Sequence, residues 1–286
     1  MDESRGFQYQ LVGSKHSTML AVSLYSLRRY HTEPIQVVCG DLDALGAVHE
    51  IAKDPLLAPI DWLAWEAPKE GGKGQQHANK ATGVEFSPFD KTIFLDADTT
   101  VHADLTELWP KTNEVHLTRF ADWVTTGGMM RGRLQAWHKV RPERVELMQR
   151  TSYPAINTGV FSFASTSTEY LEDWKATTNA NPIFMADELA AQLIFPDHKH
   201  VINSDRWNYS PRYSVPNDKA IRIRHYHGFQ HARPNKSDGW KTWCDLYHQC
   251  YAENRCGVRD LPHDKHLRLW LQENPDFMKM GATSGT

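Results

Sequence analysis

The sequence predicts an α/β protein with a mostly parallel β-sheet flanked by helices, and two observations support this fold class. Near the N-terminus a strand over residues 7–12, a helix from Ser17 or Thr18 to about Tyr30 and a strand over Ile35–Cys39 form a βαβ unit, which joins parallel strands. Further along, an apolar run over residues 93–95 predicts a buried strand that leads directly into Asp96 and Asp98. Ligands of open α/β sheets bind at the carboxyl ends of such strands.

The remaining pattern continues the alternation of helices and strands. Helices are expected over residues 42–53, 76–86, 105–109, 168–175, 187–195 and 240–252, with another near residue 267. Strands are expected over residues 61–66, 115–120, 155–163 and 221–225. The glycines of residues 71–74 predict a flexible loop, and residues 123–150 are the least regular part.

Size and composition are those of an ordinary globular protein. The chain has 286 residues, of which 40% are hydrophobic and 23% charged, enough for one large domain or two small ones. A formal net charge of −3 gives no overall attraction to nucleic acid or membrane. We expect residues 7–234 to form the main domain, residues 235–280 a helical extension packed on it, and residues 281–286 a flexible tail.

The cysteines and the N-terminus favour a reduced, cytoplasmic protein without a transmembrane segment. Cys39 lies in an apolar strand and is expected in the core. The other cysteines, Cys244, Cys250 and Cys256, repeat at a spacing of six, which matches no usual zinc pattern, although His248 nearby leaves zinc as a minor alternative. No apolar run approaches a membrane span, and the charged N-terminus lacks the apolar region of a signal peptide.

Asp96 and Asp98 are the central candidates for chemistry. In extended chain, residues two apart project to the same side, so the two carboxylates point into one space. They repel each other unless a cation lies between them, and Mg²⁺ or Mn²⁺ is the natural choice because hard cations take oxygen ligands. The structural alternative is a solvated Asp turn or a helix cap at Asp98.

The same segment fits a second pattern. Asp96, Asp98 and Thr100 spell the Asp-x-Asp-x-Thr of haloacid-dehalogenase-type phosphatases, which is the main rival interpretation. That family needs a later acidic pair, and no Asp-Asp or Gly-Asp pair follows Asp98. The turn at Gly13 has neither the spacing of a dinucleotide fingerprint nor that of a phosphate-binding P-loop.

A set of motifs in a fixed order resembles the glycogenin-like glycosyltransferases, family eight of the retaining enzymes with the GT-A fold. Lys80 comes sixteen residues before Asp96 in FLDADTTV, and AINTGVFSF follows. The helix start at Asp187 and Glu188 comes next, and then RHYHGFQHARP, in which His225 precedes Gly228 by three residues. The resemblance covers roughly residues 7–234.

The resemblance implies a role for each matching position. Asp96, Asp98 and His225 would hold Mn²⁺ (or Mg²⁺), and a histidine ligand favours Mn²⁺. The implied catalytic group is Asp187 and Asn157, which bind sugar hydroxyls, together with Lys80, which contacts the diphosphate or the sugar. The implied donor-binding residues are Val12, Gly13, His16, Lys80, Asp96, Ala97, Asp98, Asn157, Thr158, Asp187, Glu188, His225, Gly228, His231 and Arg233.

Three departures from the family pattern bear on these roles. The family often has Lys-Pro where this chain has Arg233-Pro234, so Arg233 or His231 would supply that cation. It often has Asp-Gln where this chain has Asp187 followed by Glu188. His16 lies near the place where the family commonly has an aromatic residue that stacks on uracil.

The expected activity is transfer of a hexose or related sugar from a nucleoside diphosphate sugar, most simply UDP-linked, to a hydroxyl acceptor with retention of configuration. A sugar- or nucleotide-binding module without catalysis is the other alternative. The acceptor stays open between a saccharide, a protein, a small molecule and a modified DNA base. Residues 131–150 carry a local charge of +4 and form either a solvated helix face or a surface for an anionic acceptor.

Overall fold

The computed structural model describes residues 3–68, 72–210, 213–214 and 220–227. The expected helical extension, the tail and three of the four cysteines lie outside these residues. So do three of the expected donor-binding residues, Gly228, His231 and Arg233.

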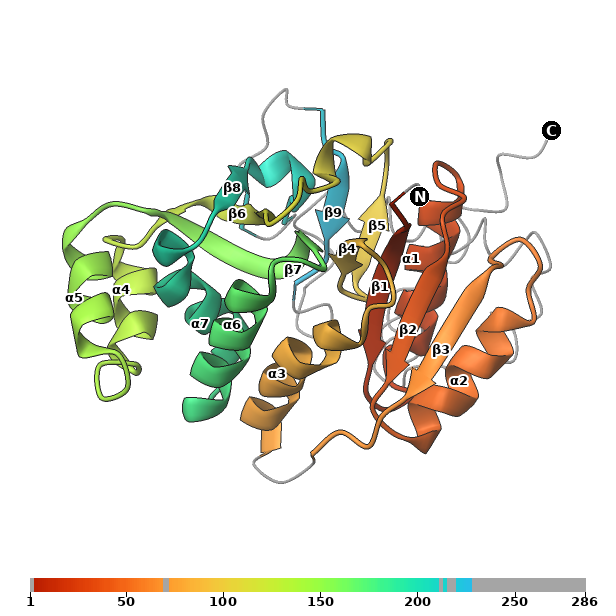
Figure 1. Ribbon diagram of the computed structural model, residues 1–286, viewed down its shortest axis with the longest axis horizontal. Coiled ribbons are helices and arrows are strands. Elements are labelled where there is room, and N and C mark those ends of the chain that lie inside the picture. The colour runs from red at the N-terminus through yellow and green to blue at the C-terminus, as the bar shows by residue number, and fades with distance from the viewer. Residues whose placement is uncertain (1–2, 69–71, 211–212, 215–219, 228–286) are drawn as a thin grey trace, which may run out of the picture.

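A seven-stranded sheet forms the centre of the molecule, with strand order β3-β2-β1-β4-β7-β6-β8 (Figure 1). Among these strands, β7 alone runs antiparallel to its two neighbours, so the sheet is mixed and mostly parallel, as the sequence predicted. The strands are β1 (Arg5–Leu11), β2 (Ile35–Cys39), β3 (Ile60–Ala64), β4 (Lys91–Leu95), β6 (Val115–Val124), β7 (Pro154–Ala164) and β8 (His200–Asn203).

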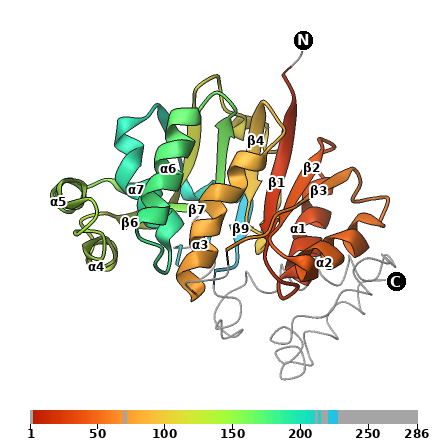
Figure 2. The same cartoon turned by 60° about the horizontal axis from the view of Figure 1, so that its bottom comes forward.

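Helices cover both faces of the sheet (Figures 1 and 2). Alternate residues of β4 belong to different apolar clusters, with Ile93 and Leu95 in one and Phe94 in the other, because successive side chains of a strand point to opposite faces. The first cluster contains residues of α1 (Ser17–Arg28) and α2 (Leu42–Ala52). The second contains residues of α3 (Gly72–Gly83), α4 (Gly128–Gln135), α5 (Pro142–Arg150), α6 (Thr168–Ala180) and α7 (Ala186–Ile194).

A small second sheet covers the outer side of α1. It pairs β5 (Thr99–Val101) with β9 (Ile223–His225), and Val101 and Ile223 belong to the same apolar cluster as α1. The Ser26 hydroxyl accepts a hydrogen bond from the Val101 N–H at 2.9 Å, and the Ser23 hydroxyl lies 3.2 Å from that of Thr99. Helix α1 therefore holds β5 in place, and with it the segment between β4 and β5 that carries Asp96 and Asp98.

The structure corrects three local expectations. Helix α3 begins at Gly72, inside the stretch expected to be a flexible loop, because Gly74 lets the helix pack directly against the Pro182 carbonyl. Residues 123–150 contain the two short helices α4 and α5, and the expected helix at 105–109 is one 3₁₀ turn, Thr106–Leu108. Strands β5 and β8 were not expected, since three or four residues are too few to show a period.

Two further features concern expectations about the environment of the chain. Cys39 is buried in the core, as predicted from its apolar strand. Within the described ranges, the helices are all too short or too polar to cross a lipid bilayer.

The packing of α3 can be tested by substituting Gly74, with Gly46 of α2 as a control. A Cβ at Gly74 would lie 1.9 Å from the Pro182 carbonyl oxygen, so Gly74→Ala should destabilise the protein by about 1–3 kcal/mol despite the better helix propensity of alanine. A Cβ at Gly46 in α2 meets nothing within 4 Å, so Gly46→Ala should stabilise it by about 1 kcal/mol. Urea unfolding measures both; a Gly74→Ala variant as stable as Gly46→Ala would contradict the close approach.

Candidate functional site

The site lies at the carboxyl end of β4, where β7 passes beside it in the opposite direction. Leu95, the last residue of β4, pairs with Val160, and the Asp96 N–H donates a hydrogen bond to the Gly159 carbonyl at 2.8 Å. The residues of β7 before Gly159 therefore continue past the end of β4. This places Asn157 and Thr158 next to the Asp-x-Asp segment.

Strand β9 brings His225 to the same place. Its pairing with β5 sets His225 opposite Thr99, and the Tyr226 N–H donates to the Asp98 carbonyl at 2.9 Å. The His225 Nε2 atom lies 3.0 Å from a carboxylate oxygen of Asp98 and 3.7 Å from one of Asp96. One ligand atom from each of the three residues lies within 4.8 Å of the others, so the expected metal ligands converge.

A chain of hydrogen bonds fixes the tautomer of His225. The Gly159 N–H donates to Asn157 Oδ1 at 2.9 Å, and Asn208 Nδ2 donates to the same oxygen at 2.7 Å. The Oδ1 atom of Asn208 therefore faces His225 Nδ1 at 2.9 Å, so Nδ1 must carry a proton. Nε2 therefore faces the carboxylates, where it carries a proton when His225 is charged and offers a lone pair when a cation takes the place of that proton.

The arrangement fits a divalent cation. A lone pair facing a carboxylate oxygen at 3.0 Å is repulsive unless a proton or a cation lies between them. Burial alone would raise the pKa of Asp98, but the His225 charge and hydrogen bond outweigh it and hold the pKa below its usual range. Two carboxylates and an imidazole whose other nitrogen is held by an amide oxygen form a set suited to Mn²⁺.

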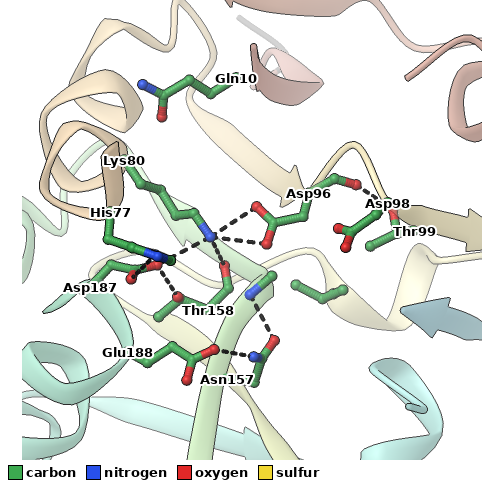
Figure 3. Close-up of polar contacts among 12 residues, drawn as sticks. Gln10, His77, Lys80, Asp96, Asp98, Thr99, Asn157, Thr158, Asp187 and Glu188 are labelled. Atoms are coloured by element: carbon green, nitrogen blue, oxygen red, sulfur yellow. Dashed lines mark hydrogen bonds and ion pairs between the residues drawn. The ribbon is translucent and has the colours of Figure 1, made fainter. Parts of the chain in front are cut away.

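Lys80 of α3 places its amine between Asp96 and Asp187 (Figure 3). Its Nζ atom lies 2.8 Å from a carboxylate oxygen of Asp96, 3.1 Å from one of Asp187 and 3.5 Å from the Thr158 carbonyl. Burial alone would lower the pKa of Lys80, but the two carboxylates outweigh it and hold the pKa above its usual range. Lys80 is therefore a permanent cation between two aspartates.

Asp187 is almost completely buried, at 1% exposure, and faces the site rather than capping its helix. The Thr158 hydroxyl donates to its Oδ2 at 2.7 Å, and His77 Nδ1 lies 3.3 Å from its Oδ1. Burial raises the pKa of Asp187, but Lys80 and His77 outweigh it and keep the pKa below its usual range. Asp187 is therefore ionised at neutral pH.

The neighbouring Glu188 is in the opposite state. The Asn157 Nδ2 group donates to one of its oxygens, which ties Glu188 to the chain of amides that reaches His225. Burial, and next the charge of Asp187, raise the pKa of Glu188 to about 8. Two adjacent carboxyl groups thus differ in protonation at neutral pH, so one accepts hydrogen bonds and the other also donates one.

A cavity of about 450 Å³ lies on the Lys80 side of the Asp-x-Asp segment. It is lined by Gln10, Leu11, Val12, Lys15, His16, Gln76, Lys80, Asp96, Ala97 and Asp98. Strand β1 pairs with β2 on one side and β4 on the other, so the cavity lies at the point where the strand order reverses, a usual ligand position.

The turn after β1 is held close to this cavity. Gly13 adopts a φ of +69°, which favours glycine, and its N–H donates to the Asp41 carboxylate at 3.0 Å. A second cavity, of about 380 Å³, lies at the ends of β2 and β3 and is lined by Cys39, Gly40, Asp41, Leu42, Leu45, Ala64, Trp65 and Glu66.

Two residues that the sequence did not indicate contact the candidate site, and two basic residues that it did indicate form ion pairs elsewhere in the fold. His77 and Asn208 contact expected site residues; His77 precedes Lys80 by three positions on one helix face, a spacing that could have revealed it. Within the basic stretch 131–150, Arg141 pairs with Asp173 at 2.9 Å and Arg144 pairs with Asp197. These two arginines therefore belong to ion pairs within the fold.

Comparisons with known proteins identify the fold. The sequence matches no protein-family model and no curated protein. Among solved structures it is similar to the galactosyltransferase LgtC in complex with donor and acceptor sugar analogues, with a TM-score of 0.58 and 12% identity over 85% of this chain and 95% of that one. It is also similar to mouse xyloside xylosyltransferase 1, with a TM-score of 0.55 and 12% identity over 80% of this chain and 100% of that one.

A third similar structure is the bifunctional glycosyltransferase WbbM, with a TM-score of 0.60 and 12% identity. The match covers 92% of this chain but 51% of that one, so this chain spans about half of the bifunctional protein. At this level of identity the likeness establishes the fold, which is the GT-A fold expected from the sequence.

Gly159 tests the position of His225. A Cβ at Gly159 would lie 2.0 Å from His225 Cε1, so Gly159→Ala should push the imidazole away from Asp98. We expect Mn²⁺ binding, measured by electron paramagnetic resonance of the free ion, to weaken by about tenfold or more. Gly128→Ala is the control, because a Cβ there meets nothing within 4 Å. Equal Mn²⁺ affinity of Gly159→Ala and the unaltered protein would rule out His225 as a ligand.

Glu188 should make the stability of the metal-free protein depend on pH. Because its pKa rises from 4.5 to about 8 on folding, its contribution is fully present below pH 4.5 and is lost as the pH rises to about 8. Glu188→Gln has no ionisable group at this position, so its stability does not fall with pH for this reason. Urea unfolding at a series of pH values should show the variant gaining stability relative to the unaltered protein between about pH 5 and 8. A difference that does not change with pH would contradict the raised pKa.

Proposed function

We propose that the chain is a metal-dependent glycosyltransferase. It moves a hexose or related sugar from a nucleoside diphosphate sugar, most simply UDP-linked, to a hydroxyl acceptor with retention of configuration. The observation that carries the proposal is the convergence of Asp96, Asp98 and His225 beside a cavity that also holds the Lys80 cation. The GT-A fold and the resemblance to family eight support the same conclusion.

In this proposal Asp96, Asp98 and His225 would hold Mn²⁺ or Mg²⁺, since each offers a ligand atom near the others. The bound cation would act as a Lewis acid that neutralises the charge developing on the departing diphosphate. The surrounding residues orient the His225 ring toward the metal position. Asn208 keeps the proton of His225 on Nδ1 so that Nε2 is free to coordinate, and Gly159 leaves room for the ring.

The nucleotide part of the donor occupies the cavity of about 450 Å³. Val12, His16 and Ala97 line it, and Gly13 shapes the turn above α1. Lys80 has three N–H donors, which now bind Asp96, Asp187 and the Thr158 carbonyl. When a diphosphate enters, Lys80 binds its oxygens and stabilises them as the sugar leaves.

The sugar lies over Asn157, Asp187 and Glu188. The Oδ1 atom of Asp187 is buried and makes no hydrogen bond among the described residues, although His77 Nδ1 stands 3.3 Å away. That oxygen is placed to accept a hydrogen bond from a sugar hydroxyl, and the protonated Glu188 is placed to donate one. The ionised Asp187 also stabilises positive charge that develops on the sugar ring during transfer.

Two observations weigh against the phosphatase alternative. That reading needs a later acidic pair, and no Asp-Asp or Gly-Asp pair follows Asp98. The metal-dependent transferase uses all the converging groups, whereas the phosphatase leaves His225 and Lys80 without a role.

The proposed function predicts a Mn²⁺-dependent thermal shift. A nucleotide sugar that binds the folded state must raise Tm by mass action, and the shift should require both Mn²⁺ and Asp98. A panel of nucleotide sugars with and without Mn²⁺ is run on the unaltered protein, on Asp98→Ala and on Asp61→Ala, an exposed aspartate on β3 that serves as control.

The shift should disappear in Asp98→Ala and persist in Asp61→Ala. Release of nucleoside diphosphate, measured on the same samples, separates an enzyme from a binding module. Turnover of a generic phosphate ester without any nucleotide-sugar shift would favour the phosphatase instead.

A further inference from the structure

An aromatic cluster contacts His225, and none of its members lines the nucleotide cavity. It comprises Phe120, Trp123, Tyr213 and His227. The His227 ring lies against His225 with a centroid distance of 3.6 Å, Phe120 lies 5.2 Å from His227, and Trp123 lies 4.7 Å from Phe120. Ring contacts therefore run without a break from the candidate metal ligand to Trp123.

A bulge in β6 sets the direction of the side chains in this cluster. Between Arg119 and Val124 the strand takes five residue steps while its partner β7 takes two, from Ile156 to Pro154. Ala121, within this bulge, has a φ of +51°, a conformation that residues with a side chain seldom adopt. Bulges redirect side chains and are frequent beside functional sites. Here the bulge directs Phe120 and Trp123 onto Tyr213, at 5.2 and 5.5 Å.

Arg133 of α4 ends the cluster. Its guanidinium lies 5.1 Å from the centre of the Trp123 ring, and its Nη1 atom is buried without a hydrogen-bond partner among the described residues. The charge of Arg133 also acts on Glu188 and partly offsets the rise of the Glu188 pKa. Arg133 therefore lies within electrostatic reach of Glu188 and has a donor group without a partner among the described residues.

We propose that Arg133 and the aromatic cluster form the acceptor subsite, and that the acceptor is an acidic saccharide. This inference rests on the proposed glycosyl transfer. Trp123 is a positioning residue, because stacking holds the guanidinium plane and leaves its N–H groups free to bind a carboxylate or phosphate on the sugar. The apolar face of the sugar ring packs on the cluster, as aromatic side chains provide large apolar contact areas.

The bound acceptor completes a balanced transfer. Its hydroxyl oxygen forms a new bond to C1 of the donor sugar, while the bond from C1 to the diphosphate breaks and its electron pair stays with the diphosphate. The proton of the acceptor hydroxyl passes to the departing diphosphate. Arg133 takes no part in these bonds and serves to orient the acceptor.

The charges favour a single acidic group over a nucleic acid. Proteins bind a nucleic-acid backbone through several cations at once, each neutralising a phosphate. In the stretch 131–150, Arg141 and Arg144 are already paired with Asp173 and Asp197, and the formal net charge of the chain is −3. The Arg133 guanidinium, which has no acidic partner among the described residues and lies beside an aromatic surface, matches a sugar with one acidic substituent.

The test compares matched acceptors, using the donor found in the thermal-shift panel together with Mn²⁺. Each set contains a methyl glycoside, its uronic acid and its 6-phosphate, in the glucose and galactose series. The uronide and phosphate arms show which acidic group is recognised. We expect kcat/KM for an acidic member to exceed that for its neutral parent by about tenfold or more, because charged hydrogen bonds are the strong ones.

Three variants separate recognition from packing. Arg133→Gln should bring the ratio of acidic to neutral acceptors close to one, mainly through KM, whereas Arg133→Lys keeps the charge and should restore part of the ratio. Arg131→Gln is the matched control, since Arg131 is exposed on the same helix and the substitution removes the same charge. It should leave the ratio unchanged.

An unchanged ratio in Arg133→Gln, or a preference of the unaltered protein for neutral acceptors, would overturn the inference. So would hydrolysis of the donor without transfer to any acidic saccharide, and in that case the proposed function would stand. The absence of both donor binding and donor hydrolysis with every nucleotide sugar would instead remove the proposed function.

Discussion

The position of the Lys80 cation between Asp96 and Asp187 is the constraint on which the site depends. Four carboxyl groups converge from β4 and α7, and like charges in a partly buried space repel strongly. Lys80 offsets the charges of Asp96 and Asp187, and His225 faces Asp98. Glu188 adds no further negative charge at neutral pH because it keeps its proton. Removing one partner of such a network leaves a buried charge uncompensated, which in other proteins costs about 3–5 kcal/mol.

This network is possible because the sheet contains one antiparallel strand. If β7 ran parallel to β4, the residues that extend past the end of β4 would come from a loop, whereas here Asn157 and Thr158 belong to a buried strand. Glycines then allow the close approaches, with Gly159 under the His225 ring and Gly74 against the Pro182 carbonyl. Asn157 and Thr158 are therefore held by regular structure, which fixes their positions more tightly than a loop would.

The sequence predicted what is local and missed what depends on folding at long range. The alternation of strands and helices, and the two carboxylates at a strand end, are visible within short windows of the chain. His225, far away in sequence, was found through a family resemblance and not from its own surroundings. Asn208 gave no signal, because its role comes from contacts with Asn157, 51 residues earlier, and with His225, 17 residues later.

The distribution of charge matches the proposed reaction. On the nucleotide side, Lys80 would offset the negative charge that grows as the diphosphate departs, and Lys15 lines the same cavity. At the sugar, the ionised Asp187 would stabilise the positive charge that develops. On the acceptor side, Arg133 would hold the acidic group of the incoming sugar. A site that had to bind both anions through one cation could not orient them separately, so in the proposed reaction Lys80 and Arg133 would each bind a different anion.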